Sequence, residues 1–125
     1  MAQHEDVEQR RAEKRARSFA KKEKLELDAA VAGLLQHPHG RRYLYFLLEI
    51  SGAIGVNPFT GDSLTTAFKC GEQNVGQQIM AHIIEVNGDG FLTMLREREA
   101  ERKEQENANA SAQGTAGLAS GDEAD

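Results

Sequence analysis

HPHGRRYLYFLLEISG, residues 37–52, is the stretch that decides the fold. Pro38 disfavours helical geometry in the residue before it and fits the first turn of a helix, so a helix is predicted to begin there. Gly52 readily adopts the positive φ with which many helices end. Apolar side chains surround almost the whole helix between these two residues, which is typical of the centre of a core. They are Tyr43, Leu44, Tyr45, Phe46, Leu47, Leu48 and Ile50.

Apolar residues at helical spacing also precede and follow this stretch. Before it they lie within residues 27–36, where the first packed helix is predicted. After it, the turn sequence PFTGDS ends in Asp62 and Ser63, either of which can cap a third helix, and Phe59 is expected to anchor the turn. The third helix carries its apolar pattern through Leu64, Phe68, Val75, Ile79 and Ile83.

Two glycines interrupt the third helix. Gly71 and Gly76 each destabilise a helix interior by about 1 kcal/mol relative to alanine, so either a kink or a close helix crossing is expected there. Asn74 lies between them, and a hydrogen bond from its side chain across that crossing would stabilise the fold. The turn sequence NGDG, residues 87–90, follows, and Asp89 is predicted to cap a fourth helix.

The chain is therefore predicted to be all-α, since its 125 residues contain no alternation typical of a strand. We expect a small bundle of three to four core helices at residues 26–105, a charged helical extension at 1–25 and a disordered acidic tail at 106–125. Residues 1–24 hold 8 basic and 5 acidic side chains, residues 25–105 hold 7 and 11, and the tail holds 0 and 4. The acidic body argues against a dedicated nucleic-acid-binding domain.

The motifs that could support chemistry are incomplete. EVNGDGFL, residues 85–92, looks like the first half of a calcium-binding loop, but Arg96 stands where a bidentate carboxylate completes the coordination. His37 and His39 lack the paired partners of a zinc site. Cys70 is the only cysteine and has no patterned histidine partner; it forms no intramolecular disulfide, as expected in a reducing compartment. We expect no enzyme activity, no catalytic residue, no metal and no cofactor.

Two surfaces are candidates for partner contact. Arg41 and Arg42 stand where the helix dipole disfavours cations, so the pair is either simply exposed or serves an acidic or phosphate-bearing partner, together with Tyr43 and Tyr45. The basic N-terminal helix is the second surface, for protein docking or for nucleic acid. Its cations are Arg10, Arg11, Lys14, Arg15, Lys21 and Lys22. Without an apolar run of about 18 residues, no membrane partner is expected.

Three motifs follow one another in the chain: GRR with aromatic residues and LLE, then FTGDS, then NVG. In this order they resemble a small helical protein family encoded in the structural-gene region of short-tailed, podovirus-like bacteriophages, often beside the portal gene. The resemblance covers about residues 35–97. It marks as motif positions Gly40, Glu49, Phe59, Gly61, Ser63, Phe68, Gly71, Asn74 and Gly76.

The resemblance implies a non-enzymatic protein that is a minor virion or assembly component, acting near the portal or ejected with the DNA. Its expected partners are phage structural proteins, either the portal or internal virion proteins, or further copies of itself. Its expected location is the host cytoplasm during infection and the virion. The alternative is a small nucleic-acid-binding or regulatory phage protein that uses the basic N-terminal helix.

Overall fold

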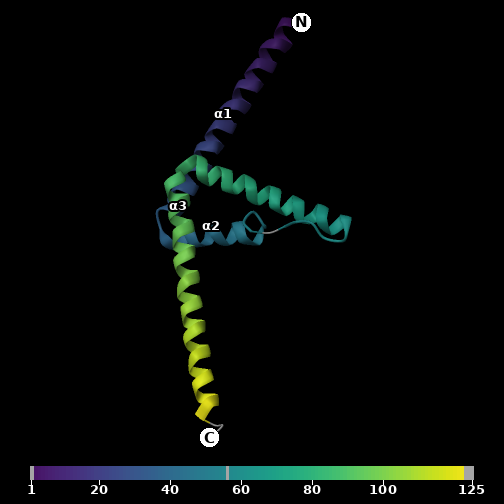
Figure 1. Ribbon diagram of the computed structural model, residues 1–125. Helices are drawn as coiled ribbons and strands as arrows, with labels where there is room; N and C mark the ends of the chain where they lie inside the picture. The colour runs from purple at the N-terminus through teal and green to yellow at the C-terminus, as the bar shows by residue number, and fades with distance from the viewer. Residues whose placement is uncertain (1, 56, 123–125) are drawn as a thin grey trace.

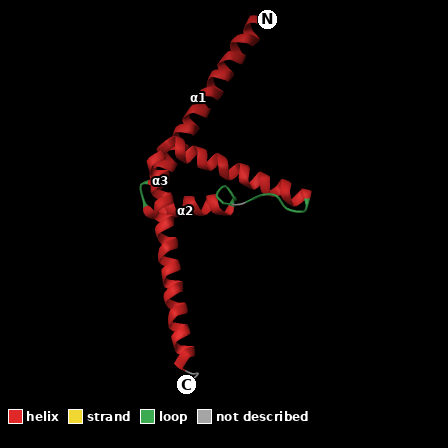
Figure 2. Ribbon diagram, viewed as in Figure 1, coloured by secondary structure: helices red, strands yellow, loops and turns green. Residues whose placement is uncertain are grey.

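The chain is an all-α protein, as the sequence predicted. The computed structural model describes residues 2–55 and 57–122, with side chains described for 3–55 and 57–114. It contains the helices α1 (Ala2–Leu35), α2 (Pro38–Ile50) and α3 (Ser63–Asp122), and no strand occurs in this described part of the chain (Figure 2).

The helices meet at one junction, and two long helical extensions leave it in different directions (Figure 1). α2 runs beside the first half of α3, and the two form a hairpin closed by the intervening loop. α1 projects from the junction on one side and the second half of α3 projects on the other. The fold is therefore a small bundle with two extensions.

A bend at Asn87 divides α3 into two arms. Asn87 has the extended dihedral angles φ −160° and ψ 91° inside an otherwise helical run. Its side-chain Oδ1 accepts a hydrogen bond from the backbone N–H of Gly90 at 3.0 Å, which is the geometry of a helix N-cap. The predicted break at residues 87–90 is confirmed, but the prediction of Asp89 as the cap is wrong, because Asn87 provides that oxygen.

Asn87→Ala is expected to lower the free energy of unfolding by about 1 kcal/mol, because it removes the cap of the second arm. Urea unfolding followed by circular dichroism measures the change. Asp89→Ala is the matched control and should change stability by less than about 0.5 kcal/mol, since its side chain is exposed. A larger loss for Asp89→Ala than for Asn87→Ala would contradict this assignment of the cap.

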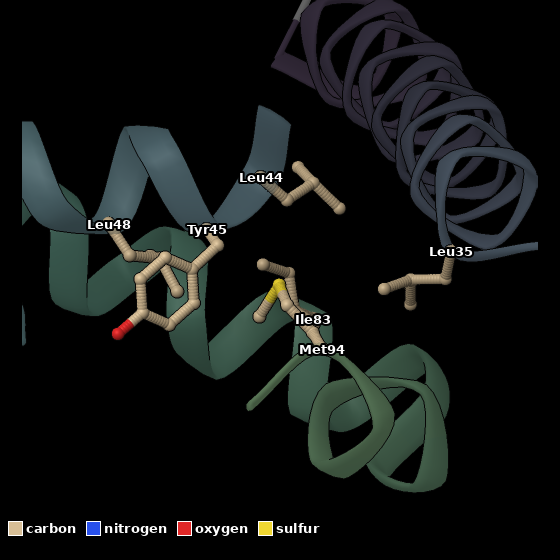
Figure 3. Close-up of a cluster of buried hydrophobic side chains, with 6 residues drawn as sticks. All are labelled: Leu35, Leu44, Tyr45, Leu48, Ile83 and Met94. Atoms are coloured by element: carbon tan, nitrogen blue, oxygen red, sulfur yellow. The ribbon is translucent and has the colours of Figure 1, made fainter. Parts of the chain in front are cut away.

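The core lies where the end of α1, α2 and both arms of α3 come together (Figure 3). α2 contributes half of its buried side chains, which confirms the prediction that this helix lies at the centre. The buried residues are Leu35, Leu44, Tyr45, Leu48, Ile83 and Met94.

Close packing explains why residue 76 of α3 is a glycine, but it does not explain why residue 71 is one. A Cβ at Gly76 would clash with Ser51 and lie 2.9 Å from the Cβ of Ala53, so the predicted close crossing occurs there. A Cβ at Gly71 would meet nothing within 4 Å, and no kink occurs at that position. Asn74 is exposed; the side-chain bond across the crossing comes instead from Gln73, whose Nε2 donates to the Gly52 carbonyl at 3.0 Å.

The loop before α3 is held by its own polar groups. Asp62 caps α3, because its Oδ2 accepts from the backbone N–H of Thr65 at 3.1 Å. Ser63 is the first helical residue and Gly61 has open space around it. The prediction that Phe59 anchors the turn is wrong, since 76% of this residue is exposed.

The extensions have no described side chain in the core. Residues 3–27 of α1 are all exposed, in agreement with a charged helical extension. Residues 106–122 continue the helical run of α3 without a described side chain in the core, and such an exposed run is only marginally stable in water, in agreement with the predicted disordered tail. Side chains 106–114 are all exposed, and residues 123–125 of that prediction lie outside the described chain.

Candidate partner-binding surfaces

Arg41 joins three helices inside the molecule. Its Nη1 donates to the Leu35 carbonyl at 2.7 Å, and its Nε and Nη2 donate to the Glu97 carboxylate at 3.0 and 2.6 Å. The hydrogen bond with Glu97 raises the pKa of the Arg41 guanidinium, and only 13% of the side chain is exposed. Arg41 therefore satisfies the C-terminal carbonyl of α1 and fixes the second arm of α3, and we correct its prediction as a partner contact.

The neighbouring charges continue this network. Arg42 lies 3.2 Å from the Glu101 carboxylate and 3.7 Å from that of Glu49. Arg98 lies 2.9 Å from Glu101 and 3.6 Å from Glu49. The acidic partner that the sequence suggested for the arginine pair is thus provided by the chain itself. Arg42 keeps 42% of its side chain exposed and remains accessible at the edge of the network.

Tyr45 belongs to the core. The residue is 3% exposed, its hydroxyl accepts from Arg102 at 3.1 Å, and the Arg98 guanidinium lies 5.8 Å from the ring centroid. Such contacts suit a buried aromatic ring with a polar tip. The prediction of Tyr45 as a contact residue is therefore wrong, and its partners come from a segment that the sequence alone describes only as charged.

Tyr43 belongs to an exposed apolar stripe on α2. Tyr43, Phe46 and Ile50 are 56%, 45% and 59% exposed, and their spacing places them on one side of the helix, away from Leu44 and Leu48. The rings of Tyr43 and Phe46 are 6.0 Å apart. We call these three residues the α2 stripe. Sequence reasoning missed Phe46 and Ile50, although their spacing from Tyr43 was a usable signal.

The remaining motif positions lie apart from this stripe. Gly40 and Gly76 sit at close helix approaches, and Glu49 takes part in the ion-pair network. Phe68 is 69% exposed, on the arm of α3 that runs beside α2. The structure therefore does not gather the motif positions into one site.

The projecting part of α1 has a cationic side. Residues four, seven and eleven apart share one side of a helix, and two such neighbouring rows contain nearly all its cations. None of the cations from residue 10 to residue 22 forms an ion pair within the described residues. The rows are Arg10, Lys14, Arg17 and Lys21, and Arg11, Arg15 and Lys22.

Ion pairs hold the base of α1 against the first arm of α3. Lys24 lies 3.3 Å from Asp28 and 3.0 Å from Glu85, and the Nε2 of His82 lies 2.7 Å from the other oxygen of Asp28. The hydrogen bond from His82 is the chief cause that lowers the pKa of the Asp28 carboxyl. This cluster sets where the unsupported part of α1 begins.

The lowered pKa of Asp28 predicts a loss of stability in acid. A carboxyl with a lower pKa in the folded state stabilises the fold above its unfolded value of about 3.9, and this contribution is lost as the pH falls through the folded value. Hydrogen bonds from Thr65 lower the pKa of Asp62 in the same direction. The urea concentration at the midpoint of unfolding, measured at pH values from neutral downward, should therefore decrease once the pH drops below about 4.

Asp28→Asn is the control for this pH dependence. The variant has no carboxyl to titrate at that position, so its midpoint should fall less steeply below pH 4 than that of the natural chain. Equal slopes for the two proteins would show that the Asp28 contacts do not contribute.

Three further findings bear on the site. In the described part of the chain, no three His, Cys, Asp or Glu residues lie together as metal ligands would. Among the same residues, no helical segment combines the length and the apolar character needed to span a lipid bilayer. Comparison with protein-family models, with curated proteins and with solved structures finds no match to the chain.

Proposed function

We propose that the chain is a non-enzymatic docking component of a bacteriophage particle or of its assembly, acting near the portal or ejected with the DNA. The observation that carries the docking role is the projecting part of α1, in which every side chain from residue 3 to 27 is exposed. A helix without tertiary support is only marginally stable in water, because packing supplies most helical stability. A partner that covers α1 would supply that support.

The α2 stripe adds a second exposed surface, which is apolar. Exposed aromatic residues that cluster on one side are typical of protein contact sites. Arg42 borders the stripe and is the accessible member of its pair. The phage context rests on the order of the GRR, FTGDS and NVG motifs.

Copy number in purified particles tests the proposal. Quantitative mass spectrometry of particles and of infected-cell lysate, referenced to the portal protein, is expected to show a fixed ratio in the particle. Abundance in the lysate with enrichment on immature particles would support the assembly role. Absence from both mature and immature particles would overturn the proposal.

A nucleic-acid-binding role is the second candidate, and the cationic side of α1 favours it. Phosphate contacts make affinity fall steeply with salt, so binding of a DNA duplex should weaken at least about tenfold between 50 and 200 mM salt. Replacing Arg11, Lys14 and Arg15 by glutamate should abolish that binding, whereas replacing Arg96 and Lys103 on α3 should leave it unchanged. Equal effects of the two sets would contradict a specific role of α1.

A further inference from the structure

We propose that a second copy of this chain packs antiparallel against the first arm of α3, through a seam formed by Leu64, Phe68, Gly71 and Val75. The steps of four, three and four residues place these positions in one row along the helix, with the spacing of a coiled-coil contact. Leu64, Phe68 and Val75 are 80%, 69% and 56% exposed. We call this row the α3 seam. The inference does not depend on the phage function proposed above.

The fold leaves the seam uncovered because α3 turns a different side toward α2. Gly76 packs against Ser51, and Gln73 bonds to the Gly52 carbonyl. Val75 precedes Gly76 by one residue, which rotates it by about 100° around the helix axis. The seam therefore lies on a different side of α3 from the contact with α2, in the part of the helix farthest from the junction (Figure 1).

Gly71 has no role inside the chain that explains a glycine. Gly40 and Gly76 both lie where a Cβ would clash with a neighbour, whereas a Cβ at Gly71 would lie in open space. A glycine within a helix destabilises that helix, and Gly71 stands within a row of exposed, large apolar side chains. At Gly71 the helix surface has a gap in the middle of an otherwise large apolar row.

The seam is self-complementary in one orientation. Its spacing is symmetric about the midpoint between residues 69 and 70, so an antiparallel second copy places Leu64 opposite Val75 and Phe68 opposite Gly71. The same two contacts form in both directions across the twofold axis. The Phe68 ring of each copy then fills the gap at Gly71 of the other, as a knob enters a hole. A parallel copy would place Phe68 against Phe68 and leave the two glycines facing each other.

The exposed surface of the chain leaves room for a dimer interface. The accessible surface is 9803 Å² for a chain of 13.7 kDa. A compact monomer of this mass exposes about 6,600 Å². The difference is larger than the roughly 600 to 1,000 Å² that each partner buries in a specific interface, and the exposed extensions contribute to it. The chain thus has ample surface for a dimer interface, and the seam is the part whose shape matches itself.

Analytical sedimentation of the full chain tests whether the α3 seam is a dimer interface. The natural chain is expected to reach twice the mass of one chain as its concentration rises, and Phe68→Asp to weaken self-association at least about 100-fold. Phe19→Asp is the matched control, because Phe19 is 71% exposed on another helix, and it should keep the natural affinity. A natural chain that stays monomeric to about 100 µM, or equal affinities for the two variants, would overturn the proposal.

Cysteine pairing tests the orientation. In a Cys70→Ser background, Leu64→Cys and Val75→Cys are made as separate proteins, and each is oxidised alone and mixed with the other. The antiparallel seam predicts disulfide-linked dimers chiefly in the mixture. Dimers that form best from Leu64→Cys alone would indicate a parallel arrangement and overturn the proposal.

Exchanging the knob and the hole gives a rescue test. Phe68→Ala and Gly71→Phe should each weaken the dimer, whereas the double variant restores a phenylalanine opposite a small residue and should regain at least tenfold of the lost affinity. Circular dichroism checks that each variant remains helical, which is expected because these positions are exposed in the single chain. Additive losses in the double variant would contradict the pairing of Phe68 with Gly71.

Discussion

Gly40→Ala is expected to lower the free energy of unfolding by about 3 kcal/mol, the upper part of the range for overpacked sites. A Cβ at Gly40 would clash with the carbonyl oxygen of Leu34 and lie 2.9 Å from its Cα. These are backbone atoms, so the clash is relieved only if the last turn of α1 separates from the first turn of α2. That separation would also disturb the bond between Arg41 and the Leu35 carbonyl.

Gly33→Ala is the matched control for this prediction. Gly33 lies near the same end of α1, but a Cβ there would meet nothing within 4 Å. Alanine favours a helix over glycine, so this change should raise the free energy of unfolding by up to about 1 kcal/mol. Urea unfolding of both variants shows whether the free energy of unfolding falls for Gly40→Ala and rises for Gly33→Ala. A Gly40→Ala protein as stable as the natural chain would show that the helices do not approach as closely as described.

Leu48→Ala should lower the free energy of unfolding by about 3 kcal/mol, which is within the range for replacing a buried leucine and leaving a cavity. Leu48 is fully buried in the cluster that α2 forms with both arms of α3 (Figure 3). Because the core has few fully buried side chains, one of them carries a large share of the stability of the fold. We expect a clear fall in the urea midpoint and in the melting temperature.

Ile50→Ala provides the comparison on the same helix. Ile50 is 59% exposed, so its truncation should change the free energy of unfolding by less than about 0.5 kcal/mol. The pair separates loss of packing from loss of helix propensity, since both changes place alanine in α2. Similar losses for both variants would contradict the assignment of one side of α2 to the core.

Local signals predicted the starts of α2 and α3 well, because a proline or a cap acts on its own neighbours. Pro38 begins α2, and Asp62 caps α3 through a bond three residues away. The cap at the bend was placed at Asp89 instead of Asn87, since both residue types can cap a helix and the sequence does not distinguish them. Errors of this kind are local and small.

Contacts between distant segments could not be predicted. α2 is apolar nearly all round, so its periodicity does not tell which of Tyr43 and Tyr45 faces another helix. The ion pair of Arg41 with Glu97 joins residues 56 positions apart, and it forms only because α3 bends at Asn87 and returns across α2. The same limit explains why Arg41 and Tyr45 were taken as partner contacts.

Hydrogen exchange tests most directly the central claim, that one small junction holds the fold and that α1 projects from it unsupported. Purified chain at a concentration where it is monomeric should show slow exchange in α2 and in residues 79–95, and fast exchange in residues 3–24 and 104–122. Partner binding should slow exchange in residues 3–24. Protection of residues 3–24 equal to that of α2 in the isolated monomer would contradict the account.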